Sequence, residues 1–195
     1  MFLGIDLPIF KLIYSLVGKS ICLDSLAIFL AQGLIYLLPA LIVLAYFFQR
    51  NLPSLPLRQR LRTDTVKLWR TREKFLKILL LTLSNLALVF LVEFFFKNLH
   101  FRSRPFAFLN FSPLIEFSSG EASFPSLHTG LAFSMAFVVY FINKKWGYLS
   151  FFLALLVGLA RVYIGVHWPT DIIAGFFLAF FSFIVTKSLL KNINP

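Results

Sequence analysis

The sequence has few charged residues, and acidic residues are the scarcest of them. Only 14% of its 195 residues are charged, with 8 acidic side chains against 19 basic ones. By contrast, 59% of the residues are hydrophobic, 26 residues are phenylalanine, and the mean hydropathy is +0.84. Soluble domains carry about 25% charged residues. The composition therefore excludes a soluble domain and indicates an integral membrane protein.

Scarcity of ligand side chains also limits the kinds of site. The single cysteine, Cys22, excludes an internal disulfide and argues against a thiolate metal site. No cluster of carboxylates suited to Mg²⁺ stands out, so we expect no cofactor, and cationic side chains must hold any bound anion. The N-terminus, Met1 to Asp6, lacks the basic start and small-residue cleavage site of a secretory signal, so we expect it to be retained.

Long apolar segments predict an all-α fold, an integral membrane helical bundle in one domain over residues 1–195. The run at residues 7–17 is shorter than the ~20 residues that a span needs. It predicts an interfacial or re-entrant helix, with a short sixth span as the alternative. Five further segments are expected to be transmembrane helices: Leu26–Phe48, Ile78–Phe96, Leu127–Ile142, Trp146–Tyr163 and Asp171–Leu190.

A strongly basic loop, residues 49–77, separates the first two spans. Its cations alternate with leucine and tryptophan, so part of it can form an amphipathic helix on anionic headgroups. Nucleic-acid binding is the alternative, and we disfavour it because cytoplasmic loops of membrane proteins commonly have this composition. Alternation of the spans places this loop, Asn143–Lys145 and the C-terminus on one side, which then holds the whole net charge of +11. The positive-inside rule makes that side cytoplasmic in the cell (inner or plasma) membrane.

Three polar clusters lie on the opposite, extracytoplasmic side, each at the end of a span. They are residues 97–105, 124–129 and 160–171. Polar groups at the edge of a bilayer are costly unless they pair or take part in chemistry. Random placement would not favour one side, so their convergence predicts a functional site.

The clusters contain groups that suit an oxyanion. Lys97, Arg104 and Arg161 supply fixed positive charge, and an arginine can bind phosphate through two hydrogen bonds. Ser126 is expected at the N-cap of the third span. The backbone N–H groups that follow it, beginning with that of Leu127, would then point at an anion.

Two histidines and a carboxylate complete the set. Pro169 suits the first turn of the fifth span. Asp171 then lies close enough to His167 to fix its tautomer, which prepares an imidazole as a nucleophile or base. His167 is placed to attack phosphorus and His128 to protonate a leaving oxygen, since two histidines in different environments can divide these roles.

Other polar residues at these helix ends receive structural interpretations. We expect Arg102 to extend to the interface as a helix-end cation and Glu93 to pair with Lys97 one turn later. His100 and Trp168 are expected to lie at the membrane interface.

At these clusters the sequence resembles the type 2 phosphatidic acid phosphatase superfamily, whose signature is K-x6-R-P, P-S-x-H and S-R-x5-H-x3-D. The matching positions are Lys97 with Arg104-Pro105, then Pro125-Ser126-Leu127-His128, then Arg161, His167 and Asp171. Two positions depart from the pattern. Leu127 stands where glycine is frequent, although it keeps its backbone N–H. Ala160 replaces the serine before the arginine, which removes one possible phosphate contact.

The resemblance implies hydrolysis of a lipid phosphate through a phosphohistidine, without a metal. His167 would be the nucleophile oriented by Asp171, and His128 the general acid that later activates water. The residues implied to hold the phosphate are Lys97, Arg104, Ser126, Leu127 and Arg161.

Within the superfamily, the short chain and residues 104–106 and 123–126 are most similar to bacterial undecaprenyl-diphosphatases of the bacitracin-resistance type. These enzymes remove the terminal phosphate of a diphosphate lipid carrier that is recycled for cell-wall synthesis. Phosphatidylglycerol phosphate and phosphatidate would suit the site equally. The alternatives from other classes are a transporter or scaffold that only binds phosphorylated headgroups, and a vanadate enzyme of the haloperoxidase type. The sequence does not indicate an oligomeric state.

Overall fold

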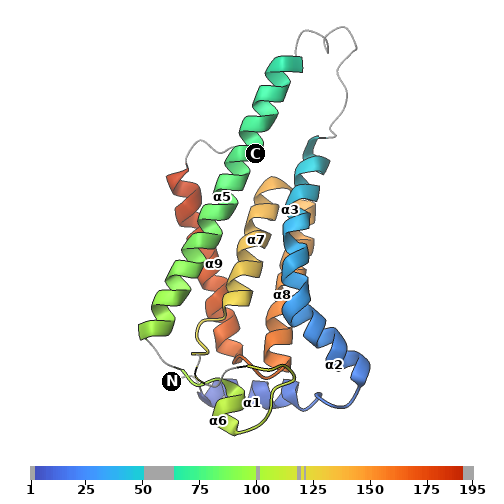
Figure 1. The fold of residues 1–195 in the computed structure, drawn as a ribbon, viewed down its shortest axis with the longest axis vertical. Helices are drawn as coiled ribbons and strands as arrows, with labels where there is room; N and C mark the ends of the chain where they lie inside the picture. Colours follow the sequence, from blue (N-terminus) through green and yellow to red (C-terminus); the bar gives the residue numbers. More distant parts are fainter. Residues whose placement is uncertain (1–2, 51–63, 100–101, 118–119, 121, 191–195) are drawn as a thin grey trace.

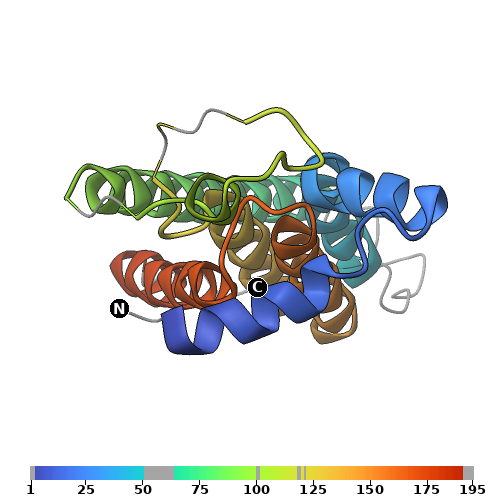
Figure 2. The ribbon, with the colours of Figure 1, turned by 90° about the horizontal axis from the view of Figure 1, so that it is seen from below.

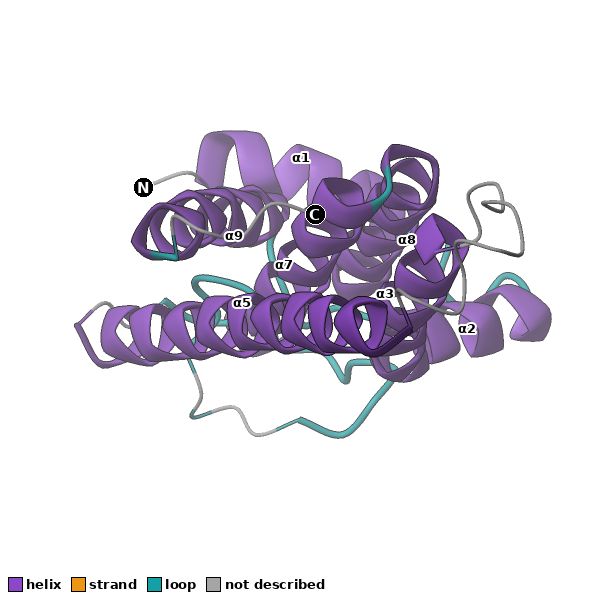
Figure 3. Ribbon diagram, turned by 90° about the horizontal axis from the view of Figure 1, so that it is seen from above, coloured by secondary structure: helices purple, strands orange, loops and turns teal. Residues whose placement is uncertain are grey.

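The computed structural model describes residues 3–50, 64–99, 102–117, 120 and 122–190. Within these ranges every regular element is a helix, as Figure 3 shows. The predicted all-α fold is therefore confirmed. The elements are α1 (Leu3–Tyr14), α2 (Ile21–Ile28), the π-helical turn η1 (Phe29–Gly33), α3 (Leu34–Arg50), α5 (Asp64–Leu99), α6 (Pro105–Leu109), α7 (Leu127–Ile142), α8 (Lys144–Tyr163) and α9 (Pro169–Leu189).

Helix α7 forms the centre of the bundle. It packs against α3, α5, α8 and α9, which surround it in Figure 1. Among the described residues, four apolar helices are long enough to cross a membrane, namely Ile21–Phe47 (through α2, η1 and α3), Arg72–Leu99 within α5, α8 and α9. With 16 residues, α7 is only about 24 Å long at 1.5 Å per residue. Neighbouring helices enclose it, so the lipid thickness does not set its length.

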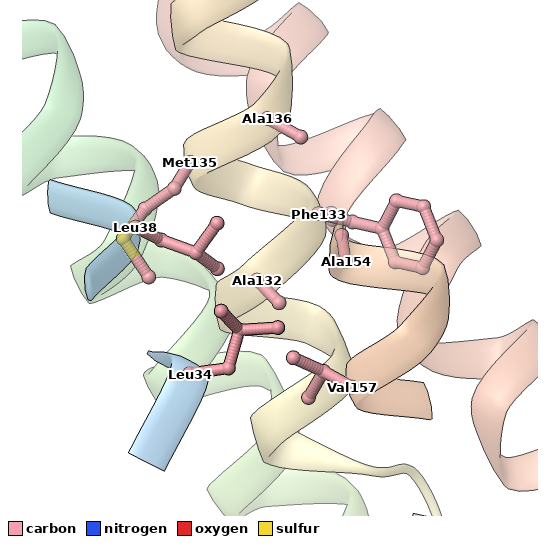
Figure 4. Packing of buried hydrophobic residues seen from close by; sticks show 9 residues of the cluster. Leu34, Leu38, Ala132, Phe133, Met135, Ala136, Ala154 and Val157 are labelled. Carbon is pink, nitrogen blue, oxygen red and sulfur yellow. The ribbon is translucent and has the colours of Figure 1, made fainter. Parts of the chain in front are cut away.

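The core of the bundle combines large side chains with small ones. Leu34 and Leu38 of α3 pack against Ala132 of α7, and Val157 of α8 lies beside them (Figure 4). Small residues allow membrane helices to approach closely. A Cβ on Gly175 of α9 would lie 2.8 Å from the carbonyl oxygen of Ser126, so glycine permits α9 to reach the start of α7.

The outward-facing side chains of the bundle are apolar. They include Tyr36, Leu91, Phe94, Phe152 and Phe181, each more than half exposed. Apolar surface of this extent is stable when lipid replaces water around it.

The N-terminal helix α1 lies across one end of the bundle, as the view along the bundle in Figure 2 shows. It packs against α8 and α9 instead of running parallel to them. This placement agrees with the predicted interfacial or re-entrant helix and not with the alternative of a sixth span. The short length of α1 and its buried Asp6 explain this placement.

The second span begins earlier than the sequence predicted. Helix α5 starts at Asp64, so the last part of the expected loop, residues 64–77, is helical and continues the span. Lysine and glutamate are good helix formers, and Glu73 pairs with Lys77 one turn later at 2.5 Å. Residues 51–63 of that loop lie outside the described residues.

Candidate active site

The three polar clusters meet at one end of the bundle. This end carries the start of α7, the end of α8 and the start of α9, with α1 and α6 beside them (Figure 1). Helix α7 ends and α8 begins at the opposite end, joined by Asn143, whose side-chain oxygen accepts hydrogen bonds from the backbone N–H groups of Lys145 and Trp146. The backbone N–H of Ser126 donates to the carbonyl oxygen of Asp171 at 3.2 Å, and Nη1 of Arg104 lies 3.4 Å from Nε2 of His167, so the three clusters are in contact. The predicted convergence is therefore present in the structure.

His167 lies in the short turn between α8 and α9. Gly165 takes a positive φ of 89° there, a conformation that favours glycine, and the turn closes in five residues. Asp171, in the first turn of α9, accepts a hydrogen bond from the backbone N–H of Trp168 at 2.8 Å. This bond caps the helix and fixes the carboxylate beside His167.

The imidazole and the carboxylate face each other as the spacing predicted. Nδ1 of His167 lies 3.5 Å from Oδ2 of Asp171, and both side chains are buried. This separation is longer than a strong hydrogen bond, and contacts of this kind tighten when substrate binds. Burial lowers the pKa of His167 to about 3, and Arg161 and Arg104 lower it too, against the opposing effect of Asp171. The ring is therefore neutral at physiological pH.

Arg104 faces the other nitrogen of the same ring. Its Nη1 lies 3.4 Å from Nε2 of His167 and donates to the carbonyl oxygen of Val166 at 3.0 Å. Its Nη2 donates to the carbonyl oxygen of Ala122 at 3.2 Å. A guanidinium can only donate, so the neutral ring presents the lone pair of Nε2 to it and carries its proton on Nδ1, toward Asp171.

An aromatic ring lies beside both buried arginines. Phe117 lies 4.1 Å from the guanidinium carbon of Arg104 and 5.5 Å from that of Arg161. Both arginines are about 1% exposed. A ring face stabilises a cation that has left water. The site thus keeps two guanidinium groups next to the histidines although both groups are almost fully shielded from solvent.

Ser126 stands at the N-cap of α7, as predicted, but its hydroxyl does not cap the helix. The hydroxyl instead accepts a hydrogen bond from Thr129 Oγ1 at 3.0 Å. The backbone N–H of Ser126 donates to the carbonyl oxygen of Asp171 at 3.2 Å, which ties the start of α7 to α9. Leu127 follows as the first residue of α7, where backbone N–H groups have no partner within the helix.

His128 lies one residue further on and is partly exposed. It lines a pocket of about 530 Å³. The opposite wall comes from the first long helix, with Ile28, Phe29, Gln32, Gly33 and Tyr36. The ring of His128 can therefore meet a molecule that enters between these helices.

Lys97 pairs with Glu93 at 2.5 Å, as the sequence predicted. Glu93 is buried, and Lys97 remains partly exposed at the end of α5. His100 lies outside the described residues.

Two sequence-based interpretations are wrong. Arg102 does not extend to the interface, because its Nη1 donates to Oδ1 of Asp171 at 2.6 Å. Trp168 is not an interfacial anchor, because it is 1% exposed, packs 5.3 Å from the ring of Phe10 on α1 and donates from Nε1 to the carbonyl oxygen of Ser103. Both side chains turn inward because α1 covers this end of the bundle.

The partners of Asp171 were not found from the sequence. Besides Arg102, the hydroxyl of Ser123 donates to its Oδ2. A buried carboxylate needs several donors. This requirement could have pointed to Arg102 and Ser123 from the sequence, because Arg102 lies within one polar cluster and Ser123 lies next to another.

Comparison with known proteins identifies the family. The family model described as PAP2 superfamily matches residues 77–195, more than half of the chain. The chain belongs to the PAP2 superfamily. The matched range contains all eight predicted site residues. The resemblance inferred from the motifs is therefore confirmed, and the apolar helices make the protein a multi-pass membrane protein.

Relatives and a solved structure agree with this assignment. The chain is 44% identical over 86 residues to the bacitracin transport permease protein BcrC of Bacillus licheniformis, which is 44% of this chain but only 42% of that relative. It is 28% identical over 171 residues to the undecaprenyl-diphosphatase BcrC of Bacillus subtilis, covering 88% of this chain and 77% of the relative. The crystal structure of LpxE from Aquifex aeolicus matches with a TM-score of 0.62 and 24% identity, over 94% of each chain, which shows a shared fold.

Proposed function

We propose that the protein is an integral membrane phosphatase that hydrolyses a lipid phosphate or diphosphate through a phosphohistidine on His167. The observation that carries this proposal is the environment of the His167 ring. Asp171 faces its Nδ1 and the guanidinium of Arg104 faces its Nε2, at 3.5 and 3.4 Å. A neutral imidazole held in this way has its nucleophilic lone pair directed at a cation that can bind a phosphoryl group.

The first step transfers the phosphoryl group to the enzyme. Nε2 of His167 attacks phosphorus and the bond to the leaving oxygen breaks, while His128 donates a proton to that oxygen. Asp171 stabilises the imidazolium that forms at His167. The negative charge on the phosphoryl oxygens is balanced by Lys97, Arg104 and Arg161, with the hydroxyl of Ser126 and the backbone N–H of Leu127 as further donors.

The second step releases phosphate. His128, now neutral, takes a proton from a water molecule that attacks the phosphorus. The bond from phosphorus to Nε2 breaks, and His167 returns to its neutral form. Cations and donors of the protein carry the charge stabilisation in both steps, so this mechanism requires no metal.

The proposed substrate is undecaprenyl diphosphate, which would yield undecaprenyl phosphate and phosphate. Relatives named undecaprenyl-diphosphatase support this choice. Space for a lipid adjoins the site on two sides, in the pocket at His128 and in an apolar groove of about 480 Å³ between α5 and α9, which begins at Phe124 and Pro125. We place the site on the extracytoplasmic side of the cell membrane because the basic start of α5 and the Asn143–Lys145 turn lie at the other end. Phosphatidylglycerol phosphate and phosphatidate are the competing substrates.

The test is phosphate release by the purified protein in detergent, with a chelator present. The substrates are undecaprenyl diphosphate, phosphatidylglycerol phosphate, phosphatidate and a soluble phosphate ester. We expect release from the diphosphate by the wild type and none by His167→Ala. A folded His167→Ala variant with an unchanged rate would refute the nucleophile, and preference for another lipid would replace the proposed substrate. A folded wild type that releases phosphate from none of them would favour a binding protein.

A further inference from the structure

The interfacial helix α1 contributes a buried carboxylate to the active-site end of the bundle. Asp6 is fully buried, although it lies in a helix that is otherwise mostly apolar. A buried carboxylate is unstable unless it is paired and hydrogen-bonded. Asp6 meets this need across the gap to α9, since it accepts hydrogen bonds from the backbone N–H of Thr170 at 2.9 Å and from its hydroxyl at 2.7 Å.

The strongest partner of Asp6 is Arg102, which connects it to Asp171. Nη2 of Arg102 donates to Oδ2 of Asp6, and Nη1 donates to Oδ1 of Asp171 at 2.6 Å. The same Nη1 reaches the hydroxyl of Thr170 at 2.8 Å, and the guanidinium lies 5.6 Å from the ring of Trp168. One guanidinium thus joins two buried carboxylates, of which the second faces His167.

We propose that Asp6 is a positioning residue for the reaction and that α1 is a working part of the active centre. This inference rests on the proposed function. Asp6 occupies Nη2 of Arg102 and so restricts Arg102 to a single contact with Asp171, through Oδ1. The other oxygen, Oδ2, makes no contact with Arg102; it accepts from Ser123 and Trp168 and faces Nδ1 of His167 at 3.5 Å.

Loss of the charge on Asp6 changes that arrangement. Arginine favours two parallel hydrogen bonds to one carboxylate. Without Asp6, the guanidinium can turn to bind both oxygens of Asp171, or swing toward solvent, because its side chain is 21% exposed. Either movement changes the hydrogen bonding of the Asp171 carboxylate, which orients His167. The cations proposed to bind the phosphate, Lys97, Arg104 and Arg161, stay in place. The proposal therefore predicts a loss in kcat with little change in KM.

Asp24 offers a matched control. It also anchors the N-terminal segment to the bundle, through a 2.6 Å hydrogen bond from the hydroxyl of Tyr163 and contacts with the backbone N–H of Gly18. None of these partners is a proposed catalytic or phosphate-binding residue. If Asp6 only attaches the N-terminal segment, Asp6→Asn and Asp24→Asn should have the same effect.

The first experiment compares steady-state kinetics of the full-length variants, after a melting curve in detergent has shown that each is folded. Replacing the hydrogen-bond partners that orient metal-binding histidines typically changes activity by about 10–100-fold. By analogy, we expect Asp6→Asn to lower kcat at least about tenfold, with KM within about twofold. Asp6→Glu should recover part of the loss, and Asp24→Asn should change kcat less than about twofold. The double variant Asp6→Asn/Arg102→Gln should be no slower than Arg102→Gln alone, since both act through one contact. Equal effects of Asp6→Asn and Asp24→Asn, or additive effects in the double variant, would overturn the proposal.

A second measurement does not depend on turnover. Nitrogen NMR of ¹⁵N-histidine-labelled protein, in a His100→Gln/His128→Gln background, reports the protonation and hydrogen bonding of His167 alone. Asp6→Asn should shift the Nδ1 signal and Asp24→Asn should leave it unchanged. An Nδ1 signal that does not move in Asp6→Asn would refute the positioning role. Inactivity of the wild type toward every lipid would refute only the proposed function, because the NMR comparison would still decide the role of Asp6.

Discussion

His167 is solvated in the unfolded chain and buried in the folded protein, and this difference makes stability depend on pH. Its pKa falls from 6.5 to about 3 on folding, mainly because burial disfavours the charged ring. Below pH 6.5 the unfolded chain therefore binds a proton that the folded protein does not. Stability from this residue is complete above pH 6.5 and is lost as the pH falls toward 3.

The expected result is a lower melting temperature in acid that depends on His167. One pKa unit corresponds to 1.36 kcal/mol, so moving from neutral pH to pH 5 should lower the free energy of unfolding by about 2 kcal/mol. The measurement is thermal unfolding in detergent at both pH values. His167→Gln, which cannot be protonated at this position, serves as the control. Its melting temperature should fall less between the two pH values than that of the wild type. An equal loss in both proteins would show that His167 is not buried in its neutral form.

The sequence predicted that the residues of the candidate site lie close together, as they do in the structure, whereas it did not predict their supporting contacts. His128, His167 and Asp171 fall at fixed spacings near helix ends, and such spacings are local. The inward positions of Arg102 and Trp168 depend on α1, which contacts them from more than ninety residues away in sequence. A single sequence contains no signal for that contact beyond the unexplained acidic residue in α1.

Helix ends were predictable where a capping residue marks them. The bounds predicted for α7 agree with the structure, and those of α8 and α9 differ by no more than two residues, because Asn143 and Pro169 interrupt the apolar sequence there. The start of α5 was missed because its first turns are basic, and apolar content alone does not reveal a helix that leaves the bilayer. The π-helical turn η1 was not predicted either, since its residues are ordinary for a membrane helix.

The close approach of α9 to α7 should be sensitive to one methyl group. Gly175→Ala places a Cβ 2.8 Å from the carbonyl oxygen of Ser126 and 3.1 Å from Cβ of Thr129, which pushes the start of α7 away from Asp171. Overpacking of this kind costs about 1–3 kcal/mol. We expect a lower melting temperature and a lower kcat, measured on the same purified sample.

Gly4→Ala is the matched control for this substitution. A Cβ at Gly4 meets no atom within 4 Å, so the change adds the same methyl group without a clash. It should leave melting temperature and activity near those of the wild type. If Gly175→Ala behaves like Gly4→Ala, the contact between α9 and α7 is looser than the structure indicates.

The molecule as a whole has an asymmetric charge distribution, which predicts its orientation. The basic start of α5 and the Asn143–Lys145 turn lie at the end opposite to the candidate site, and the net charge of the chain is +11. A reporter fused after Lys145 should therefore be cytoplasmic, and one inserted at Gly120 should be external. Both can be read with enzymes that are active on only one side of the membrane. An external reporter at Lys145 would reverse the proposed side of the site.

The single-residue connection between α7 and α8 has a consequence for membrane insertion during synthesis. Helix α7 is too short to hold a stable position in lipid alone, while α8, which begins after a single intervening residue, has the length to span. Only Asn143 joins the two helices, so we expect the translocon to release them into the bilayer as one helical hairpin. His128 on α7 is then delivered together with Arg161 on α8, and we expect assembly to end when α9 packs against them and brings Asp171 into place.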